Sequence, residues 1–133
     1  MSLNETPMTI WYWEQVGGKL IEEFLIVNAG KGQGKRAVNG LIVLGGRKKR
    51  LAPGSKLDIK GKDVLIIQSK NKRLGMSLMG QTLFSAELVK RLGPWSVQSV
   101  ALCRETDEVL QPLLEAHKGC KVGVCPASVT ASH

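Results

Sequence analysis

Three polar residues of this sequence could form a binding site: Asn39, Gln68 and Lys70. Gln68 and Lys70 follow an apolar run and are two residues apart, so in a strand they share one face. If Leu44 pairs near Asp63 in an antiparallel hairpin, Asn39 falls opposite Gln68. Two amides and an ammonium group at one end of a hairpin suit a polar, anionic ligand. The alternative is that the strand has simply reached solvent.

The charge of the chain favours a polyanionic ligand. The net charge is +8, and lysine and arginine are concentrated in the first two thirds of the sequence. A basic field confined to one region is typical of proteins that bind DNA or RNA, although a soluble surface rich in lysine has the same composition. The candidate phosphate-binding residues are Lys35, Arg36, Lys48, Lys49, Lys72 and Arg73.

The length of 133 residues suits one domain, which we expect at residues 13–126, after a lead-in (1–12) and before a disordered tail (127–133). No apolar stretch reaches the ~20 residues of a membrane span, and the N-terminus does not resemble a signal peptide. Three cysteines, an odd number, favour reduced thiols and a cytoplasmic location. A zinc site made by Cys120, Cys125 and His117 is an alternative, but the spacings fit no common pattern.

Apolar spacing and turn residues predict an α/β fold: a mixed sheet with helices on both faces. Apolar residues three or four apart, from Trp13 to Val27, predict a helix. Strands are expected at 37–44, 63–70, 97–102 and 120–125, with a short extra strand around 56–59. Further helices are expected at 77–92 and, capped by Thr106 or Asp107, up to about residue 117.

In this order of elements, Asn39 and Gln68-Ser69-Lys70 resemble the D…(D/E/Q)xK signature of the PD-(D/E)XK nuclease superfamily. That superfamily includes archaeal Holliday-junction resolvases, many restriction enzymes, and the Mrr and NERD families. Glu22-Glu23 on the preceding helix and Gln81 on the following helix match further positions of its pattern. The resemblance implies a restriction-endonuclease-like core, α-β-β-β-α-β, over residues 13–104, extended by the last helix and strand.

The resemblance also implies site residues. Glu23, Asn39 and Gln68 would hold Mg²⁺ or Mn²⁺, while Lys70 and Gln81 would complete a catalytic set for phosphodiester hydrolysis. At about 100° per residue, Glu23 flanks the apolar stripe of the expected helix and Glu22 points away from it. Asp58 and Asp63 are alternative acids, but the hairpin register places both at the opposite end from Gln68.

Asn39 departs from the pattern, because the superfamily has an aspartate there. An amide oxygen brings no charge, so it would hold a metal poorly. We therefore expect a metal-dependent DNA endonuclease domain impaired by Asn39, either an inactivated variant or a natural binder that has lost cleavage. The alternative is a non-catalytic nucleic-acid-binding module on the same fold. Because a duplex has two strands, we also expect a homodimer or a higher homo-oligomer.

A glycine-rich segment, Ala29–Lys35, fits part of a nucleotide-binding loop. Such a loop follows a strand, ends in Ser or Thr and opens a helix, whereas here Arg36 replaces the hydroxyl and a strand is expected next. The segment is better interpreted as a basic loop whose N–H groups, with Lys35 or Arg36, contact nucleic-acid phosphates. ATP binding remains a third alternative.

Overall fold

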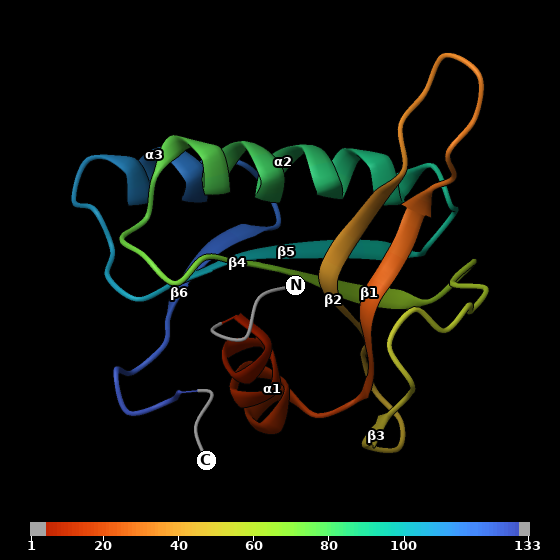
Figure 1. The fold of residues 1–133 in the computed structure, drawn as a ribbon, viewed down its shortest axis with the longest axis horizontal. Helices are drawn as coiled ribbons and strands as arrows, with labels where there is room; N and C mark the ends of the chain where they lie inside the picture. The colour runs from red at the N-terminus through yellow and green to blue at the C-terminus, as the bar shows by residue number, and fades with distance from the viewer. Residues whose placement is uncertain (1–4, 131–133) are drawn as a thin grey trace.

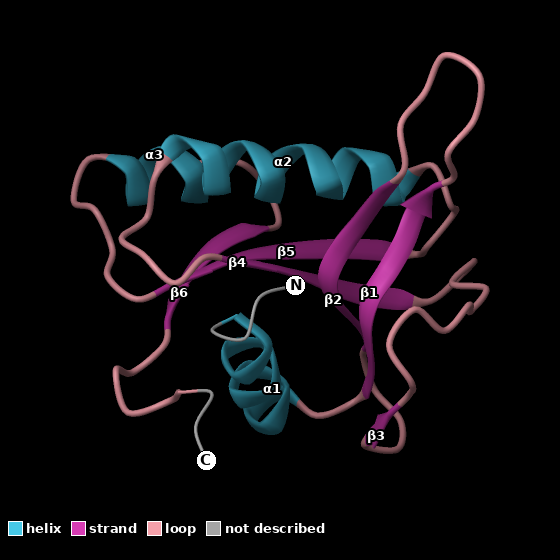
Figure 2. Cartoon of the chain, in the orientation of Figure 1, coloured by secondary structure: helices cyan, strands magenta, loops and turns pink. Residues whose placement is uncertain are grey.

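The computed structural model describes residues 5–130 and shows an α/β fold, as expected: a mixed six-stranded sheet flanked by helices. Helices α2 and α3 cover one face of the sheet and α1 lies against the other (Figure 1). Figure 2 shows the same layers coloured by secondary structure. The elements, in chain order, are α1 Glu5–Val16, β1 Lys19–Val27, β2 Arg36–Val43, β3 Lys49–Arg50, β4 Asp63–Ser69, α2 Met76–Lys90, β5 Ser96–Cys103, α3 Leu110–Glu115 and β6 Cys120–Val124.

The strand order is β3-β1-β2-β4-β5-β6. β1, β2 and β4 are antiparallel neighbours, whereas β5 and β6 continue the sheet in parallel with β4. β4 therefore lies in the interior of the sheet, which explains its continuous apolar run. The β2–β4 ladder pairs Gly40 with Ile67 and Val43 with Val64, and the Leu44 N–H donates to the Asp63 carbonyl at 2.9 Å. The register predicted from the sequence is confirmed.

Each face of the sheet has its own hydrophobic core. The core under α2 includes Phe24, Ile66 and Val89, and the core under α1 includes Met8 and Ile67. Alternate residues of β4 supply the two cores, as the pleat of a strand requires. The central strand is thus held from both sides.

The expected helix from Trp13 to Val27 is wrong, because residues 19–27 form β1. Helix α1 ends at Val16, and Gly17 and Gly18 turn the chain with φ of 77° and 81°. Glu23 then has a φ of 51°, an irregularity that lets Ile21 and Phe24 face the same core although they are three residues apart. That spacing imitates a helix, which is why the apolar pattern was misleading.

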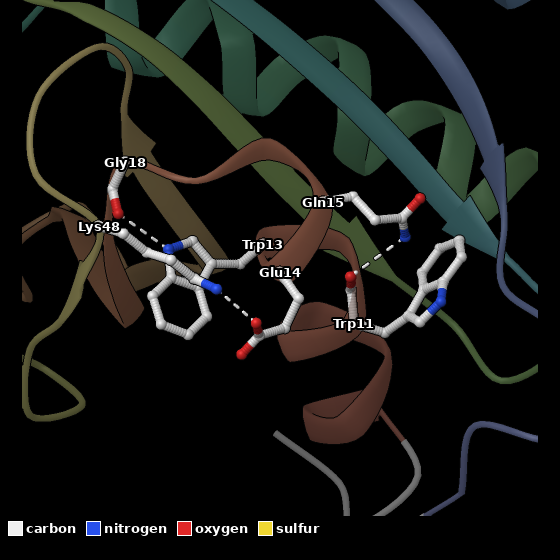
Figure 3. Close-up of polar contacts among 6 residues, drawn as sticks. All are labelled: Trp11, Trp13, Glu14, Gln15, Gly18 and Lys48. Atoms are coloured by element: carbon white, nitrogen blue, oxygen red, sulfur yellow. Dashed lines mark hydrogen bonds and ion pairs between the residues drawn. The ribbon is translucent and has the colours of Figure 1, made fainter.

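Helix α1 also begins earlier than expected, inside the segment interpreted as a lead-in. Met8 is fully buried, so this segment packs on the sheet. Figure 3 shows how the end of the helix is fixed: the Trp13 indole N–H donates to the Gly18 carbonyl at 2.9 Å, and Lys48 pairs with Glu14. The Lys48 ammonium also lies 5.1 Å from the centre of the Trp13 ring. These contacts tie α1 to the turn before β1 and to the loop before β3.

Smaller differences concern the segments around the sheet. The short extra strand is Lys49–Arg50, not residues 56–59, and Ile59 is instead buried within a loop. Asp107 caps α3 as expected, because its carboxylate accepts the N–H groups of Val109 and Leu110 at 2.9 Å. Those two hydrogen bonds hold the pKa of Asp107 below its ordinary value.

The C-terminal segment was expected to be disordered from residue 127. Residues up to 130 instead turn back toward α1, where Val129 packs against the core. Arg104 donates to the carbonyl oxygens of Pro126 and Val129. Residues 131–133 lie outside the described residues. Within the described chain, no helix combines the length and the apolar character that crossing a bilayer requires.

Candidate functional site

The site lies where β2 and β4 separate. Their backbone ladder stops at Gly40 and Ile67, and side chains bridge the strands beyond that pair. The Asn39 N–H donates to Gln68 Oε1 at 3.3 Å, and the Ser69 N–H donates to Asn39 Oδ1 at 2.8 Å. These two contacts fix which amide atom faces which partner, because a backbone N–H requires an oxygen. Asn39 thus lies across from Gln68, as predicted.

This bridge continues to both helical layers. On one side, Gln68 Nε2 donates to the Ser85 hydroxyl of α2 at 2.7 Å. On the other, the Ser69 hydroxyl lies 3.5 Å from the Thr9 hydroxyl of α1. Gly40 allows this approach, because a Cβ there would lie 2.8 Å from the Thr9 methyl group. A connected set of polar side chains therefore holds the strand ends apart at a defined separation.

A pocket of about 440 Å³ opens beside these strand ends. Four of the five residues predicted for the catalytic set line it together: Asn39, Gln68, Lys70 and Gln81. Asn39 and Lys70 are half-buried, Gln68 is buried and Gln81 is exposed. A volume of this size suits a small ligand or one nucleotide unit, and the wall is polar on the sheet side.

Glu23, the predicted helical acid, does not line this pocket. It lies in β1, not in a helix, so the helical argument that chose it over Glu22 fails. Glu22 is 2% exposed and accepts a hydrogen bond from Arg50 at 2.7 Å. The acid that α1 does bring to the pocket is Glu5, in its first turn.

Glu5 and Ser85 were missed in the sequence, although both carried a signal. Glu5 lies two residues before Pro7, and an acid and a proline together mark the start of a helix. Ser85 lies four residues, about one helical turn, after Gln81, so the two residues lie on the same side of α2. Because the first helix was expected to start at Trp13, the helix-start signal at Glu5 and Pro7 was not recognised.

The basic residues are divided between the two ends of the sheet. Arg36 lines the pocket, and Lys35 precedes it in the loop at 28–35, which projects beyond the sheet (Figure 1). That loop joins two strands, so it lacks the helix that a nucleotide-binding loop opens. Lys72 and Arg73 are exposed just after Lys70, and Arg73 pairs with Glu105. Arg36 and Lys70 are thus the cations among the described residues that line the pocket. Lys35, Lys72 and Arg73 are exposed on the adjoining segments.

Lys48 and Lys49 lie elsewhere, near the opposite end of β2. Lys48 is engaged with Glu14 and the Trp13 ring, which gives it a structural contact on α1. Asp63 begins β4, at the end far from Gln68, as the register predicted. It is exposed and accepts the Ser96 hydroxyl at 2.6 Å.

The donor set of the pocket fits a divalent cation poorly in this sequence. Mg²⁺ is usually bound through one or two carboxylates together with water and phosphate. Here Glu5 is the carboxylate among the described residues that line the pocket, and Asn39 Oδ1 already accepts from Ser69. Among residues 5–130, no cluster of three or more His, Cys, Asp or Glu side chains could hold a metal. An aspartate at position 39 could keep the contact with Ser69 and add a second, charged oxygen.

The chain was compared with protein-family models, curated proteins and solved structures, and none of them matches.

Proposed function

We propose that this chain is a DNA endonuclease domain of the PD-(D/E)XK type, metal-dependent in its intact form and impaired here by Asn39. The observation that carries the proposal is the convergence of Asn39, Gln68 and Lys70 in one pocket where two antiparallel strands separate. The order α1-β1-β2-β4-α2-β5 supports a restriction-endonuclease-like core. The net charge of +8 supports a nucleic-acid substrate.

Several polar residues of the pocket would have roles suited to phosphodiester hydrolysis. Lys70 would lie against the scissile phosphate and stabilise the negative charge that develops on it. Gln68 is held by Asn39 and Ser85, so its amide keeps the strand end in place. Glu5 takes the place proposed for Glu23, and an acid at position 39 would complete a pair of carboxylates. Arg36 would position the neighbouring phosphate.

The decisive variant is Asn39→Asp. We expect it to cleave DNA in Mg²⁺ or Mn²⁺, and we expect the unchanged chain to cleave far more slowly. Adding Lys70→Ala to the variant lowers the rate about a hundredfold or more, whereas adding Lys118→Ala, a change of an exposed lysine distant from the pocket, leaves it unchanged. The assay follows cleavage of labelled linear, nicked and branched DNA on a gel. Failure of Asn39→Asp to cut any of these forms contradicts the proposal.

A second function is favoured by the contacts within the pocket: the amides of Asn39 and Gln68 are already hydrogen-bonded within the protein, and the described lining residues include a single carboxylate. A non-catalytic nucleic-acid-binding module would have such a pocket. It predicts salt-sensitive binding with no metal dependence, even in Asn39→Asp. The same variant therefore separates the two functions.

We also propose that two copies act together, because one pocket reaches one strand of a duplex. Sedimentation of the protein with and without DNA tests this. A single copy per duplex in the complex would contradict it.

A further inference from the structure

An exposed aromatic ring lies at the pocket, and packing does not explain it. Phe84 of α2 is 65% exposed and lines the same pocket as Gln68 and Lys70. The residues that α2 buries against the sheet are different ones, among them Leu78 and Val89. A phenylalanine left in solvent costs free energy that burying the ring would recover. The ring is therefore available to a ligand of the pocket.

The surface beside Phe84 is open at Gly80. Gly80 lies one turn earlier on α2 and also lines the pocket, and a Cβ at Gly80 would meet nothing within 4 Å. Residues four apart on a helix lie on the same face, so the ring borders a stretch of bare backbone. Met76, one turn further, is 77% exposed. Phe84, Gly80 and Met76 thus form an uncovered apolar strip that leads away from the pocket.

At its Phe84 end the strip lies beside two cations. Lys70 and Arg36 line the pocket beside Phe84, opposed by the single described acid there, Glu5. A ring next to cations is the arrangement that binds single-stranded nucleic acid, because the base stacks on the ring and its phosphate lies on the cation. A protein partner would need the apolar strip but not the cations.

We propose that Phe84 stacks on an unpaired base next to the phosphate at Lys70, so that the substrate is single-stranded or branched nucleic acid. This inference rests on the proposed function and names its substrate class. In a paired duplex each base is covered on both faces by its neighbours, and opening such a stack costs a few kcal/mol. A ring on the wall of a nucleotide-sized pocket therefore selects bases that are already unstacked.

The test measures binding rather than cleavage, on the unchanged chain and on Phe84→Leu, Phe84→Trp and Trp95→Leu. The probes are dye-labelled oligothymidylate and its duplex with oligoadenylate, followed by fluorescence anisotropy. We expect Phe84→Leu to weaken binding of the single strand roughly five- to hundredfold and to leave duplex binding within about twofold. Phe84→Trp keeps the affinity because it keeps a ring. Trp95→Leu, which removes a ring that is 81% exposed outside this pocket, changes neither.

The other outcomes overturn the inference. If Phe84→Leu loses equal affinity for both probes, or loses none for the single strand, the ring does not bind unpaired bases selectively. A change from dimer to monomer in Phe84→Leu, measured by sedimentation, assigns the ring to a protein interface instead. If the unchanged chain binds neither probe, the proposed function fails along with the inference. If it binds both and Phe84→Leu has no effect, only the inference fails.

Discussion

The two ends of β4 have similar surfaces and different interiors. At the Asp63 end, the exposed ring of Trp95 lies with Lys90 and Lys118. At the Ser69 end, the exposed ring of Phe84 lies with Lys70 and Arg36. Both ends therefore present an aromatic ring and two cations to solvent. The composition of the surface alone would not show which end is the better candidate for a binding site.

The buried contacts do distinguish the two ends of β4. At the Asp63 end the ladder is closed, with Val43 opposite Val64, and the polar contact between Ser96 and Asp63 is exposed. At the other end the ladder stops, and Asn39 bonds across the gap to Gln68 and Ser69. The buried Gln68 side chain is in turn bonded to Ser85 of α2. Buried polar groups are costly unless they are satisfied, so their presence at one end marks that end as specialised. The comparison teaches that the two ends of β4 differ in their buried polar contacts and not in their surface charge.

The largest expected effect concerns core packing at the two ends of β4. We call the Ser69 end, where the ladder stops, the open end, and the Asp63 end the closed end, and we ask whether both are equally well packed. Ile67 is fully buried at the open end, and Leu65 is 2% exposed in the closed half, both on the α1 face. We expect Ile67→Ala and Leu65→Ala each to lower the free energy of unfolding by about 2–5 kcal/mol. Denaturant titration measures both. A loss below about 1 kcal/mol for Ile67→Ala alone would show that the open end is frayed and that the amide bridge is not fixed.

The next largest effect is the loss of unfolding free energy on removing a serine hydroxyl at each end of β4. Ser85→Ala leaves the buried Nε2 of Gln68 without its acceptor, which costs about 1–3 kcal/mol of unfolding free energy. Ser96→Ala removes an exposed contact with Asp63 and costs less than about 0.5 kcal/mol. Both are measured by thermal and denaturant unfolding. Equal costs would remove the distinction between the two ends.

The smallest effect concerns the layer beneath the open end. Cys103 ends β5, next to the strand end at Ser69, and burial raises the pKa of its thiol above the ordinary value of 9.0. The folded thiol keeps its proton where the unfolded thiol ionises, so its contribution to stability is present below about pH 9 and is lost as pH rises further. Unfolding free energy should fall less steeply above pH 9 in Cys103→Ala than in the unchanged chain.

Alkylation gives the companion measurement for Cys103. Iodoacetamide should react with this thiol slowly in the folded protein at neutral pH, because the thiolate is the reactive form. Rapid modification without denaturant would mean that water enters behind the pocket, and the contrast between an open pocket and a dry core would be lost.

The sequence predicted the pairing of the two central strands better than the elements around them. The register of β2 and β4 followed from two short apolar runs, because a slip of one residue would turn every side chain to the wrong face. That register placed Asn39 opposite Gln68. The helical argument failed for Glu23, because residues 19–27 form a strand and the positive φ of Glu23 changes which side chains of that strand face the core. Apolar spacing cannot distinguish a strand with such an irregularity from a helix.

Longer-range features were beyond the sequence. Where β2 and β4 separate, the end of β4 contacts Thr9 and Ser85, which come from helices on opposite faces. The exposure of Phe84 depends on which face of α2 meets the sheet. Neither can be derived from the spacing of residues along one element.

The most direct test of the central claim is a crystal structure of the Asn39→Asp variant soaked in Mn²⁺, with the metal located by its anomalous scattering. The account predicts a peak in the pocket between β2 and β4, within bonding distance of the carboxylate at position 39 and facing Glu5. A crystal that binds Mn²⁺ only elsewhere, at Asp58 or Asp63 for example, or that shows no peak at saturating Mn²⁺, would contradict it.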